Sequence, residues 1–359
     1  MKLRAERDDL ADALARAGRA VSTRSPLPIL QGLLLEVEGN RLTATGTDNE
    51  VTIKTFLDVE ALEAGRTVVP AKLAADAVRK LPSGAVSIHV RDGEVEITGN
   101  GPKFTLRAMN VDDFPRPSEE PVDGDVEVEG DVLLRAIGQV GVAASTDEAR
   151  PMLTGVLFEA TEEGLRLVAT DSYRLAVKDV PGVSTEGARL VPYRALRELG
   201  RTIGGGRMTV GLGEREAVFA TGTGKLRVRI IDAAFPNYRQ LLPEGYPNRL
   251  VVDKEALLEG IGRAALVAED HIPVRLDLHP GGVGLSVIRQ EVGEETEHLE
   301  ADYQGEEMTI AFNTRYLTDG VAAVEGDQVV VETVDPLKPG LIHGLEGDTF
   351  RYLLMPVRL

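Results

Sequence analysis

The chain of 359 residues is long enough for two or three domains, and its 43% hydrophobic content suffices for ordinary packed cores. Its 40 Lys and Arg residues against 58 Asp and Glu residues give a net charge of −18, which excludes a surface that is basic everywhere and confines any nucleic-acid contact to local patches. The absence of cysteine excludes disulfides, thiolate nucleophiles and thiolate metal sites, and it fits a reducing cytoplasm.

The first residues, MKLRAERDDL, carry charge where a secretory signal needs an apolar run. No later stretch reaches the length of a membrane span. We therefore expect a soluble cytoplasmic protein without membrane contact.

The chain opens with a short strand and an acidic turn into a helix over residues 2–21, and this pattern returns over 126–144 and 249–268. Asp131 and Asp253 stand where a helix N-cap is expected. Apolar residues recur at spacings of three to four after Asp131, which predicts a helix with one buried face.

A β-hairpin is predicted next, because alternating apolar residues flank the turn dipeptide Gly39-Asn40. A second helix is predicted to start at Pro70 in the first copy and at Pro192 in the second, since proline is favoured in the first helical turn. Period-two alternation with glycine turns over residues 86–106 then predicts an antiparallel meander.

Internal repetition sets the architecture. Segment 28–48 recurs as 151–171 with eight identities in 21 aligned positions, including the dipeptides Thr47-Asp48 and Thr170-Asp171. A fainter third copy has Asn313 at the position of Pro192. We predict three α+β domains, each with two helices packed on antiparallel sheet, over residues 1–120, 121–244 and 245–359.

No catalytic or metal-binding motif is legible. The histidines lack HxxxH and HExxH spacing, and the run Gly222–Lys225 lacks the flanking residues of a phosphate loop, so it is predicted as a hairpin turn. The GIGRAA run at 260–265 lies inside a predicted helix and is assigned to close packing. Asp48 and Asp171 end strands, where turn acceptors are favoured over catalytic acids. We expect no catalytic residue, metal or cofactor.

The second helices of the first two copies are basic against this acidic background. Their cations are Lys72, Arg79 and Lys80 in the first copy and Arg194, Arg197 and Arg201 in the second. Spacings of three, four and seven place much of that charge on one helical stripe. One such helix alone is read as a solvated face, whereas two equivalent ones favour sequence-independent contact with nucleic-acid phosphates.

Motifs along the whole chain resemble the bacterial DNA polymerase III β subunit family, the sliding clamps. They are RSPLPIL (24–30), TGTD (45–48), VPAK (69–72), ATDSYRLAV (169–177), FPNYRQLLP (235–243) and LLMPVRL (353–359). The resemblance implies a head-to-tail homodimer whose six domains close into a ring, with helices lining the hole. It further implies a processivity factor that encircles double-stranded DNA without reading its sequence, tethers the replicative polymerase and has no enzymatic activity.

The resemblance also implies particular contact residues. DNA contacts carried over by match are Arg24, Lys72, Arg79 and Arg194, with Arg150 as a candidate in an imperfectly matching stretch, and the helical stripes add Lys80, Arg197 and Arg201. The dimer contact would join Phe104 and Leu106 to Leu266 and Val267 of the second copy. Core packing within each domain is the alternative for these four residues.

The implied partner site is an apolar cleft between the second and third domains that binds short linear motifs. The matching residues are Leu153, Thr170, Ser172, Tyr173, Arg174, Leu175, Pro236, Leu241, Pro339, Leu353, Met355, Pro356, Val357, Arg358 and Leu359. Met355 would supply adaptability and Arg174 a charged rim. Ser172-Tyr173 stands where the family often has Gly-His, and Gln240 replaces a frequent Arg, so an altered peptide preference is expected.

The implied partners are the DNA polymerase III catalytic subunit, an ATP-dependent clamp loader, and other polymerases and repair proteins that carry a short clamp-binding motif. Two other functions remain open on the residues alone. One is an enzyme with dispersed carboxylates, acting on saccharides through Asp48 or Asp171, for which Asp171→Asn would abolish activity. The other is a repeat scaffold that binds only protein, which would not associate with DNA at any salt concentration.

Overall fold

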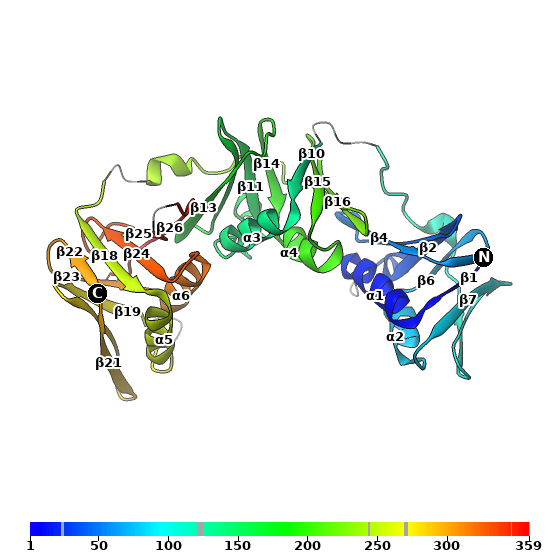
Figure 1. Cartoon of the computed structure of the whole chain (residues 1–359), viewed down its shortest axis with the longest axis horizontal. Coiled ribbons are helices and arrows are strands. Elements are labelled where there is room, and N and C mark those ends of the chain that lie inside the picture. The colour runs from blue at the N-terminus through cyan, green and yellow to red at the C-terminus, as the bar shows by residue number, and fades with distance from the viewer. Residues whose placement is uncertain are drawn as a thin grey trace. The chain divides into compact units, whose positions relative to one another are not determined.

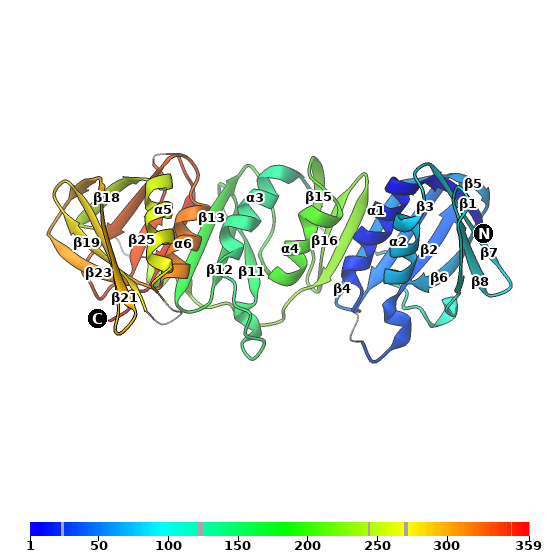
Figure 2. The same ribbon diagram turned by 90° about the horizontal axis from the view of Figure 1, so that it is seen from below.

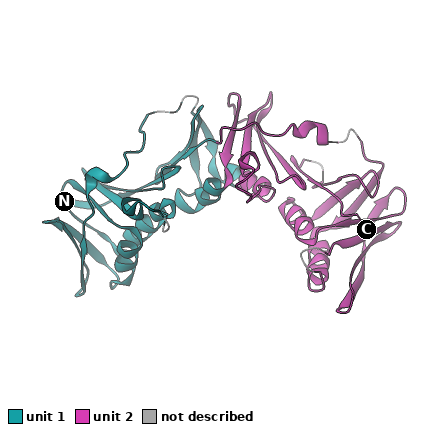
Figure 3. Ribbon diagram, turned by 180° about the vertical axis from the view of Figure 1, so that it is seen from behind, with its two compact units in different colours: residues 1–134, 194–230 teal, residues 135–193, 231–359 magenta. Residues whose placement is uncertain are grey.

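The computed structural model describes residues 1–22, 25–120, 122, 125–242, 245–268, 272–345 and 347–358. The chain folds into two compact units, coloured separately in Figure 3. Unit 1 comprises Met1–Leu134 and Arg194–Ile230, and unit 2 comprises Arg135–Tyr193 and Ile231–Leu359. The second sequence repeat therefore contributes strands to both units.

The elements follow one order in each repeat (Figure 1). The first repeat contains β1 (Lys2–Glu6), α1 (Arg7–Ala17), β2 (Gly32–Glu38), β3 (Arg41–Thr47), β4 (Val51–Asp58), β5 (Glu60–Glu63), β6 (Gly65–Pro70), α2 (Ala71–Lys80), β7 (Ala85–Arg91), β8 (Glu94–Thr98) and β9 (Lys103–Arg107). The second contains β10 (Val126–Glu129), α3 (Gly130–Gly141), β11 (Gly155–Ala160), β12 (Gly164–Thr170), β13 (Arg174–Pro181), β14 (Ala188–Pro192), α4 (Tyr193–Thr202), β15 (Arg207–Leu212), β16 (Glu216–Thr221) and β17 (Gly224–Arg229).

The third repeat contains β18 (Asn248–Asp253), α5 (Lys254–Ala265), β19 (Val274–His279), β20 (Gly282–Arg289), β21 (Gly293–Glu300), β22 (Asp302–Gln304), β23 (Met308–Phe312), α6 (Thr314–Ala323), β24 (Gln328–Thr333), β25 (Gly340–His343) and β26 (Phe350–Leu354). Short 3-10 helices occupy Gly18–Ala20, Pro28–Gln31, Val111–Asp113, Pro151–Leu153 and Tyr238–Leu241. This two-helix, antiparallel-sheet composition of each repeat confirms the predicted α+β class.

Over its described residues, unit 1 has a five-stranded sheet, β5-β1-β7-β8-β9, and an eight-stranded sheet, β10-β15-β16-β17-β4-β3-β2-β6. The larger sheet joins the first and second repeats, because β17 pairs antiparallel with β4. Helices α1, α2 and α4 lie on one face of this sheet (Figures 1 and 2). Leu10 and Leu14 of α1 and Val78 of α2 are fully buried in the core beneath α1 and α2.

In the described part of unit 2, the sheets are the nine-stranded β14-β11-β12-β13-β26-β25-β24-β18-β22 and the four-stranded β21-β20-β19-β23. The larger one joins the second and third repeats through antiparallel pairing of β13 with β26, from Arg174 opposite Leu354 to Lys178 opposite Phe350. Figure 2 shows α5 and α6 side by side in this unit.

Local predictions are confirmed where they rest on turn chemistry. Strands β2 and β3 form the predicted hairpin, and Gly39 at its turn has φ +55°. The Asp253 side chain caps α5 by accepting a hydrogen bond from the backbone N–H of Ala256 at 2.8 Å. The run Gly222–Lys225 includes the turn between β16 and β17, and the GIGRAA run lies within α5.

Two predicted helix starts were wrong by one residue. Pro70 and Pro192 end the edge strands β6 and β14, and the helices begin at Ala71 and Tyr193. Proline fits the end of an edge strand because it has no N–H to donate to a ladder. Asp131 is not an N-cap but lies in the first turn of α3, which starts at Gly130. A Cβ at that glycine would approach the backbone oxygen of Gly206 to 2.5 Å.

Candidate nucleic-acid and partner surfaces

Helix α2 exposes its cations and buries its small apolar residues. Lys72, Arg79 and Lys80 are exposed, whereas Ala74 and Val78 are buried against the sheet. Their spacing gives this result because residues three, four and seven apart share one helical face. The predicted basic stripe is therefore presented to solvent.

Helix α4 repeats this arrangement in the same unit. Arg194, Arg197 and Arg201 are exposed, whereas Leu196 and Leu199 are buried. Helices α2 and α4, which carry the two stripes, lie on one face of the eight-stranded sheet (Figures 1 and 2). Exposed cations that share a face can bind the phosphates of a nucleic acid without reading its bases.

The cations of the two stripes differ in how far they are neutralised. Arg194 pairs with Asp48 at 3.2 Å, and Arg197 approaches Glu198 at 3.9 Å. The other four form no ion pair with any described residue: Lys72, Arg79, Lys80 and Arg201. The unpaired group supplies most of the charge that a phosphate could meet.

Of the other two predicted DNA contacts, the structure describes only Arg150, which lies outside the helices. Arg150 belongs to unit 2 and is exposed, but its guanidinium bonds Asp147 at 2.8 Å and Ser172 Oγ at 3.3 Å. The hydrogen bond from Arg150 lowers the pKa of Asp147. Arg150 is thus engaged both by Asp147 of its own loop and by Ser172 of the turn between β12 and β13. Arg24 lies outside the described residues.

Asp48 and Asp171 act as turn acceptors, as predicted. Asp48 Oδ1 accepts from the N–H groups of Glu50 and Val51 at 2.9 and 2.7 Å. Asp171 Oδ1 accepts from those of Tyr173 and Arg174 at 2.9 and 3.1 Å. Each of the two carboxylates also holds an arginine through Oδ2.

Ser172, within the second of these turns, has φ +83°. This left-handed backbone favours glycine, which agrees with the Gly that the family often has at this position.

The predicted partner residues gather on unit 2. Leu175 and Leu353 are buried in an apolar cluster with Tyr238, and Leu153 is also buried, whereas Tyr173 is 59% exposed. Of the remaining predicted residues, Thr170 is buried, Pro339, Pro356 and Val357 are half-buried, and Pro236, Leu241, Met355, Ser172 and Arg358 are exposed. Leu359 lies outside the described residues. We call the exposed apolar residues Tyr173, Leu241 and Met355, with their neighbours in this set, the partner surface.

The C-terminal segment is attached to this surface by backbone bonds. The N–H of Met355 donates to the carbonyl of Tyr173 at 2.9 Å, and that of Val357 donates to Ala311 at 2.8 Å. Met355 thus leaves strand β26 beside Tyr173 with its side chain 44% exposed. A flexible thioether at such a place can adapt to different ligands.

The prediction that Arg174 forms a charged rim was wrong. Its side chain is 7% exposed, and its Nε and Nη1 atoms pair with Asp171 at 2.9 Å and with Asp319 at 2.6 Å. A guanidinium with two carboxylates close by can be buried, because they replace the water it loses. Arg174 is therefore a buried cation beneath the partner surface.

Sequence reasoning missed a further residue of this region, Tyr316. The ring of Tyr316 lies 6.4 Å from that of Tyr173. No local pattern marked Tyr316, because it reaches Tyr173 only through tertiary packing.

The four predicted dimer residues have different environments. Phe104 and Leu106 lie on β9, an edge strand of the five-stranded sheet, with Phe104 half-buried and Leu106 6% exposed. Leu106 belongs to the core of the first repeat, so the core-packing alternative accounts for its burial. Leu266, at the end of α5, is 86% exposed, and Val267 is half-buried. Leu266 is thus the most accessible apolar side chain of the four.

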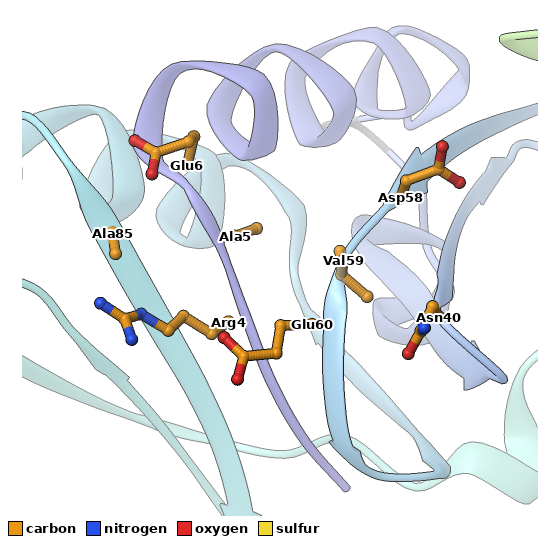
Figure 4. Close-up of a pocket in the computed structure, with 8 residues that line it drawn as sticks. All are labelled: Arg4, Ala5, Glu6, Asn40, Asp58, Val59, Glu60 and Ala85. Atoms are coloured by element: carbon orange, nitrogen blue, oxygen red, sulfur yellow. The ribbon is translucent and has the colours of Figure 1, made fainter.

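A hollow of about 550 Å³ in unit 1 contains none of the predicted residues (Figure 4). Its lining residues are Arg4, Ala5, Glu6, Asn40, Asp58, Val59, Glu60 and Ala85. The carboxylates of Glu6, Asp58 and Glu60 stand apart from one another in Figure 4 and do not converge on one point. No group of three or more His, Asp or Glu side chains suited to a metal ion occurs among the described residues.

No helix in the described part of the chain is both long enough and apolar enough to cross a membrane.

Comparisons with known proteins point to one family along the whole length of the chain. Family models match residues 1–118 (DNA polymerase III beta subunit, N-terminal domain), 127–237 (central domain) and 239–358 (C-terminal domain). Curated relatives include the beta sliding clamps of Streptomyces coelicolor, 32% identical, and Caulobacter vibrioides, 33% identical, each covering 100% of both chains.

Among solved structures, a Caulobacter crescentus beta sliding clamp with polyethylene glycol bound to a putative beta-motif tethering region is similar, with TM-score 0.94 and 31% identity over 100% of this chain and 99% of that one. A Pseudomonas aeruginosa sliding clamp bound to griselimycin has TM-score 0.94 and 29% identity over 100% of both chains.

Proposed function

Because the chain belongs to the DNA polymerase III beta subunit family, the bacterial sliding clamps, we propose that two copies close head to tail into a ring around double-stranded DNA. Heterologous contacts that close generate rings. A polymerase tethered to such a ring gains effective concentration at the primer end, which is the physical basis of processivity. The observation that carries the proposal is the pair of exposed basic stripes on one face of unit 1 in a chain of charge −18.

We assign the chain three domains, 1–120, 121–244 and 245–359. The separate family matches to 1–118, 127–237 and 239–358 support this division. The strands of the central domain are shared between the two compact units, so each domain boundary is bridged by a continuous sheet.

DNA contact is assigned to Arg24, Lys72, Arg79, Lys80, Arg150, Arg194, Arg197 and Arg201. The exposure of the six helical cations supports this assignment. Their contacts would be electrostatic and independent of base sequence, which allows the ring to slide.

The partner surface of unit 2 is assigned to short motifs in other replication proteins. These are the DNA polymerase III catalytic subunit, an ATP-dependent clamp loader, and other polymerases and repair proteins. The exposed Tyr173, Leu241 and Met355 beside a buried apolar cluster support this assignment, since exposed apolar patches mark protein contacts. The similar Caulobacter crescentus clamp binds polyethylene glycol at a region named for tethering a beta motif, which supports a docking role in this family.

The protein itself is not an enzyme, needs no cofactor, and works in the cytoplasm as a homodimer. Asp48 and Asp171, the acids of the rival enzymatic hypothesis, are each engaged through both oxygens, in a turn and with an arginine. Such carboxylates stabilise the fold and are poorly placed to transfer protons.

The test is retention on DNA. The protein is loaded on nicked circular plasmid by a matching clamp loader with ATP, the complex is isolated, and half is linearised with a single-cut nuclease. A ring that encircles the DNA is released from the linear DNA only and stays on the circular DNA. Equal release or equal retention on both forms indicates ordinary surface binding and overturns the proposal.

A further inference from the structure

The buried Arg174 joins the second and third repeats. Asp171 belongs to the same turn as Arg174, but Asp319 lies on α6 and Tyr352 on β26, both in the third repeat. Nη1 of Arg174 donates to Asp319 Oδ2 at 2.6 Å and to the Tyr352 hydroxyl at 3.3 Å. A single side chain is thus held from three elements of unit 2.

The same contacts reach the partner surface through Tyr316. The guanidinium of Arg174 stacks on the Tyr316 ring, 4.1 Å from its centre. The hydroxyl of Tyr352 donates to the backbone carbonyl of Tyr316 at 2.8 Å. The Tyr316 ring is 6.4 Å from that of the exposed Tyr173. The Arg174 cluster, which consists of Arg174, Asp171, Asp319 and Tyr352, therefore supports an aromatic pair at the surface.

The buried charge of Arg174 is compensated by all three of its partners together. Burial alone would lower the pKa of Arg174, and Tyr352, Asp319 and Asp171 outweigh that effect and raise it. Tyr352 is fully buried, and burial raises its pKa, so its hydroxyl stays protonated and able to donate. Removing one partner of a buried charge leaves that charge poorly compensated.

An acidic residue at the position of Asp319 has the same role in unit 1. Asp319 lies six residues after Asn313, and Glu198 lies six residues after Pro192, the equivalent position of the second repeat. Glu198 pairs with Arg19 of the first repeat. In both units this helical acid therefore holds an arginine of the preceding repeat.

We propose that Asp319 and Tyr352 are positioning residues of the partner surface, which hold Arg174 against Tyr316 and thereby keep Tyr316 and Tyr173 in place for a docked peptide. This inference rests on the proposed function of that surface. It makes peptide affinity depend on residues of the third repeat that a peptide need not touch.

The test measures binding of a fluorescein-labelled peptide that carries the clamp-binding motif of the polymerase III catalytic subunit. Asp319→Asn is expected to weaken binding about tenfold, and Tyr352→Phe by a similar factor, because each loosens Arg174. The matched controls are Tyr246→Phe, which removes a buried hydroxyl without a hydrogen-bond partner among the described residues, and Glu325→Gln, which neutralises an exposed acid beyond the end of α6. Both controls are expected to bind as the unaltered protein does.

A double-mutant cycle separates positioning from general stability. In an Arg174→Met background, Asp319→Asn is expected to cause no further loss of affinity, since the residue through which it acts is gone. An unaltered protein that fails to bind the peptide would overturn the proposed function of the surface. Normal binding by the unaltered protein with equal affinity in Asp319→Asn and Tyr352→Phe, or equal losses of affinity in both backgrounds, would overturn the positioning role alone.

Discussion

Asp48 and Asp171 have the same two tasks in two copies of the repeat. In each, Oδ1 accepts two backbone N–H groups of the following turn, and Oδ2 binds an arginine. The arginine differs, because Asp48 holds Arg194 from α4 whereas Asp171 holds Arg174 from its own turn. The two copies thus share the turn geometry and differ in the element that supplies the arginine.

Glycine at a helix position can also be required by a neighbouring ring. A Cβ at Gly320 of α6 would lie 2.4 Å from the Tyr352 ring, whereas a Cβ at Gly262 of α5 would have nothing within 4 Å. Gly320→Ala is expected to lower the free energy of unfolding by about 1–3 kcal/mol through overpacking. Gly262→Ala is expected to raise it by up to about 1 kcal/mol, because alanine favours the helix.

Urea unfolding of the two variants beside the unaltered protein checks the opposite signs. Stabilisation by both substitutions would show that the Tyr352 ring moves freely, and it would weaken the argument that this ring holds Arg174 in place.

At the scale of elements, α2 and α4 have the same distribution of buried and exposed side chains. Alanine, valine or leucine lines the buried face, and the exposed face carries the cations. The third equivalent helix, α6, departs from it, since it offers only Arg315 as an exposed cation and uses Asp319 to bind Arg174. The basic stripe is therefore a property of the first two copies, whereas the equivalent helix of the third copy pairs its acid with a buried arginine of unit 2.

The stripes predict a specific salt dependence. Replacing Arg79, Arg197 and Arg201 with Ala is expected to weaken binding to short linear duplex DNA and to reduce the slope of log affinity against log salt by about 0.9 for each lost phosphate contact. Fluorescence anisotropy at several salt concentrations measures both quantities.

The matched control replaces three exposed strand arginines, Arg66, Arg91 and Arg207, and so changes the net charge equally. A control that reduced the slope as much as the helical variant did would show that net charge alone, and not the two stripes, governs DNA binding.

At the scale of the whole molecule, the two compact units do not follow the sequence repeats. The second repeat gives β10 and β15–β17 to unit 1 and β11–β14 to unit 2. Because β17 needs β4 and β13 needs β26, cutting the chain between repeats would expose strand edges. The compact units are therefore defined by their shared sheets and not by the sequence repeats.

Ring closure makes a prediction about Leu266. Its 86% exposed side chain is expected to be covered by a second copy, so Leu266→Glu should place a carboxylate in an apolar contact and weaken dimerisation by more than about tenfold. Light scattering after size exclusion measures the mass of the particle. Leu62→Glu, at a 54% exposed leucine of β5, is the control. A Leu266→Glu dimer as stable as that control would remove Leu266 from the interface.

The sequence by itself determined the three repeats, the α+β class, the first hairpin, the turn role of Asp48 and Asp171, and the basic stripes. These features depend on local periodicity, turn chemistry and internal repetition, all of which are legible within a short window of residues. The resemblance in motifs such as LLMPVRL supplied the family, and the comparisons confirmed it.

Only the tertiary structure decided the burial of Arg174, the division of the second repeat between two units, and the burial of Leu106. Arg174 meets Asp319 and Tyr352 across 145 and 178 residues of chain. The sequence alone predicts that a charged side chain is exposed, because its distant partners are not visible in the sequence. Burial is favourable only when such carboxylates and hydroxyls replace water. Long-range strand pairing and ion pairing leave no local period, so they become visible only when the chain is folded.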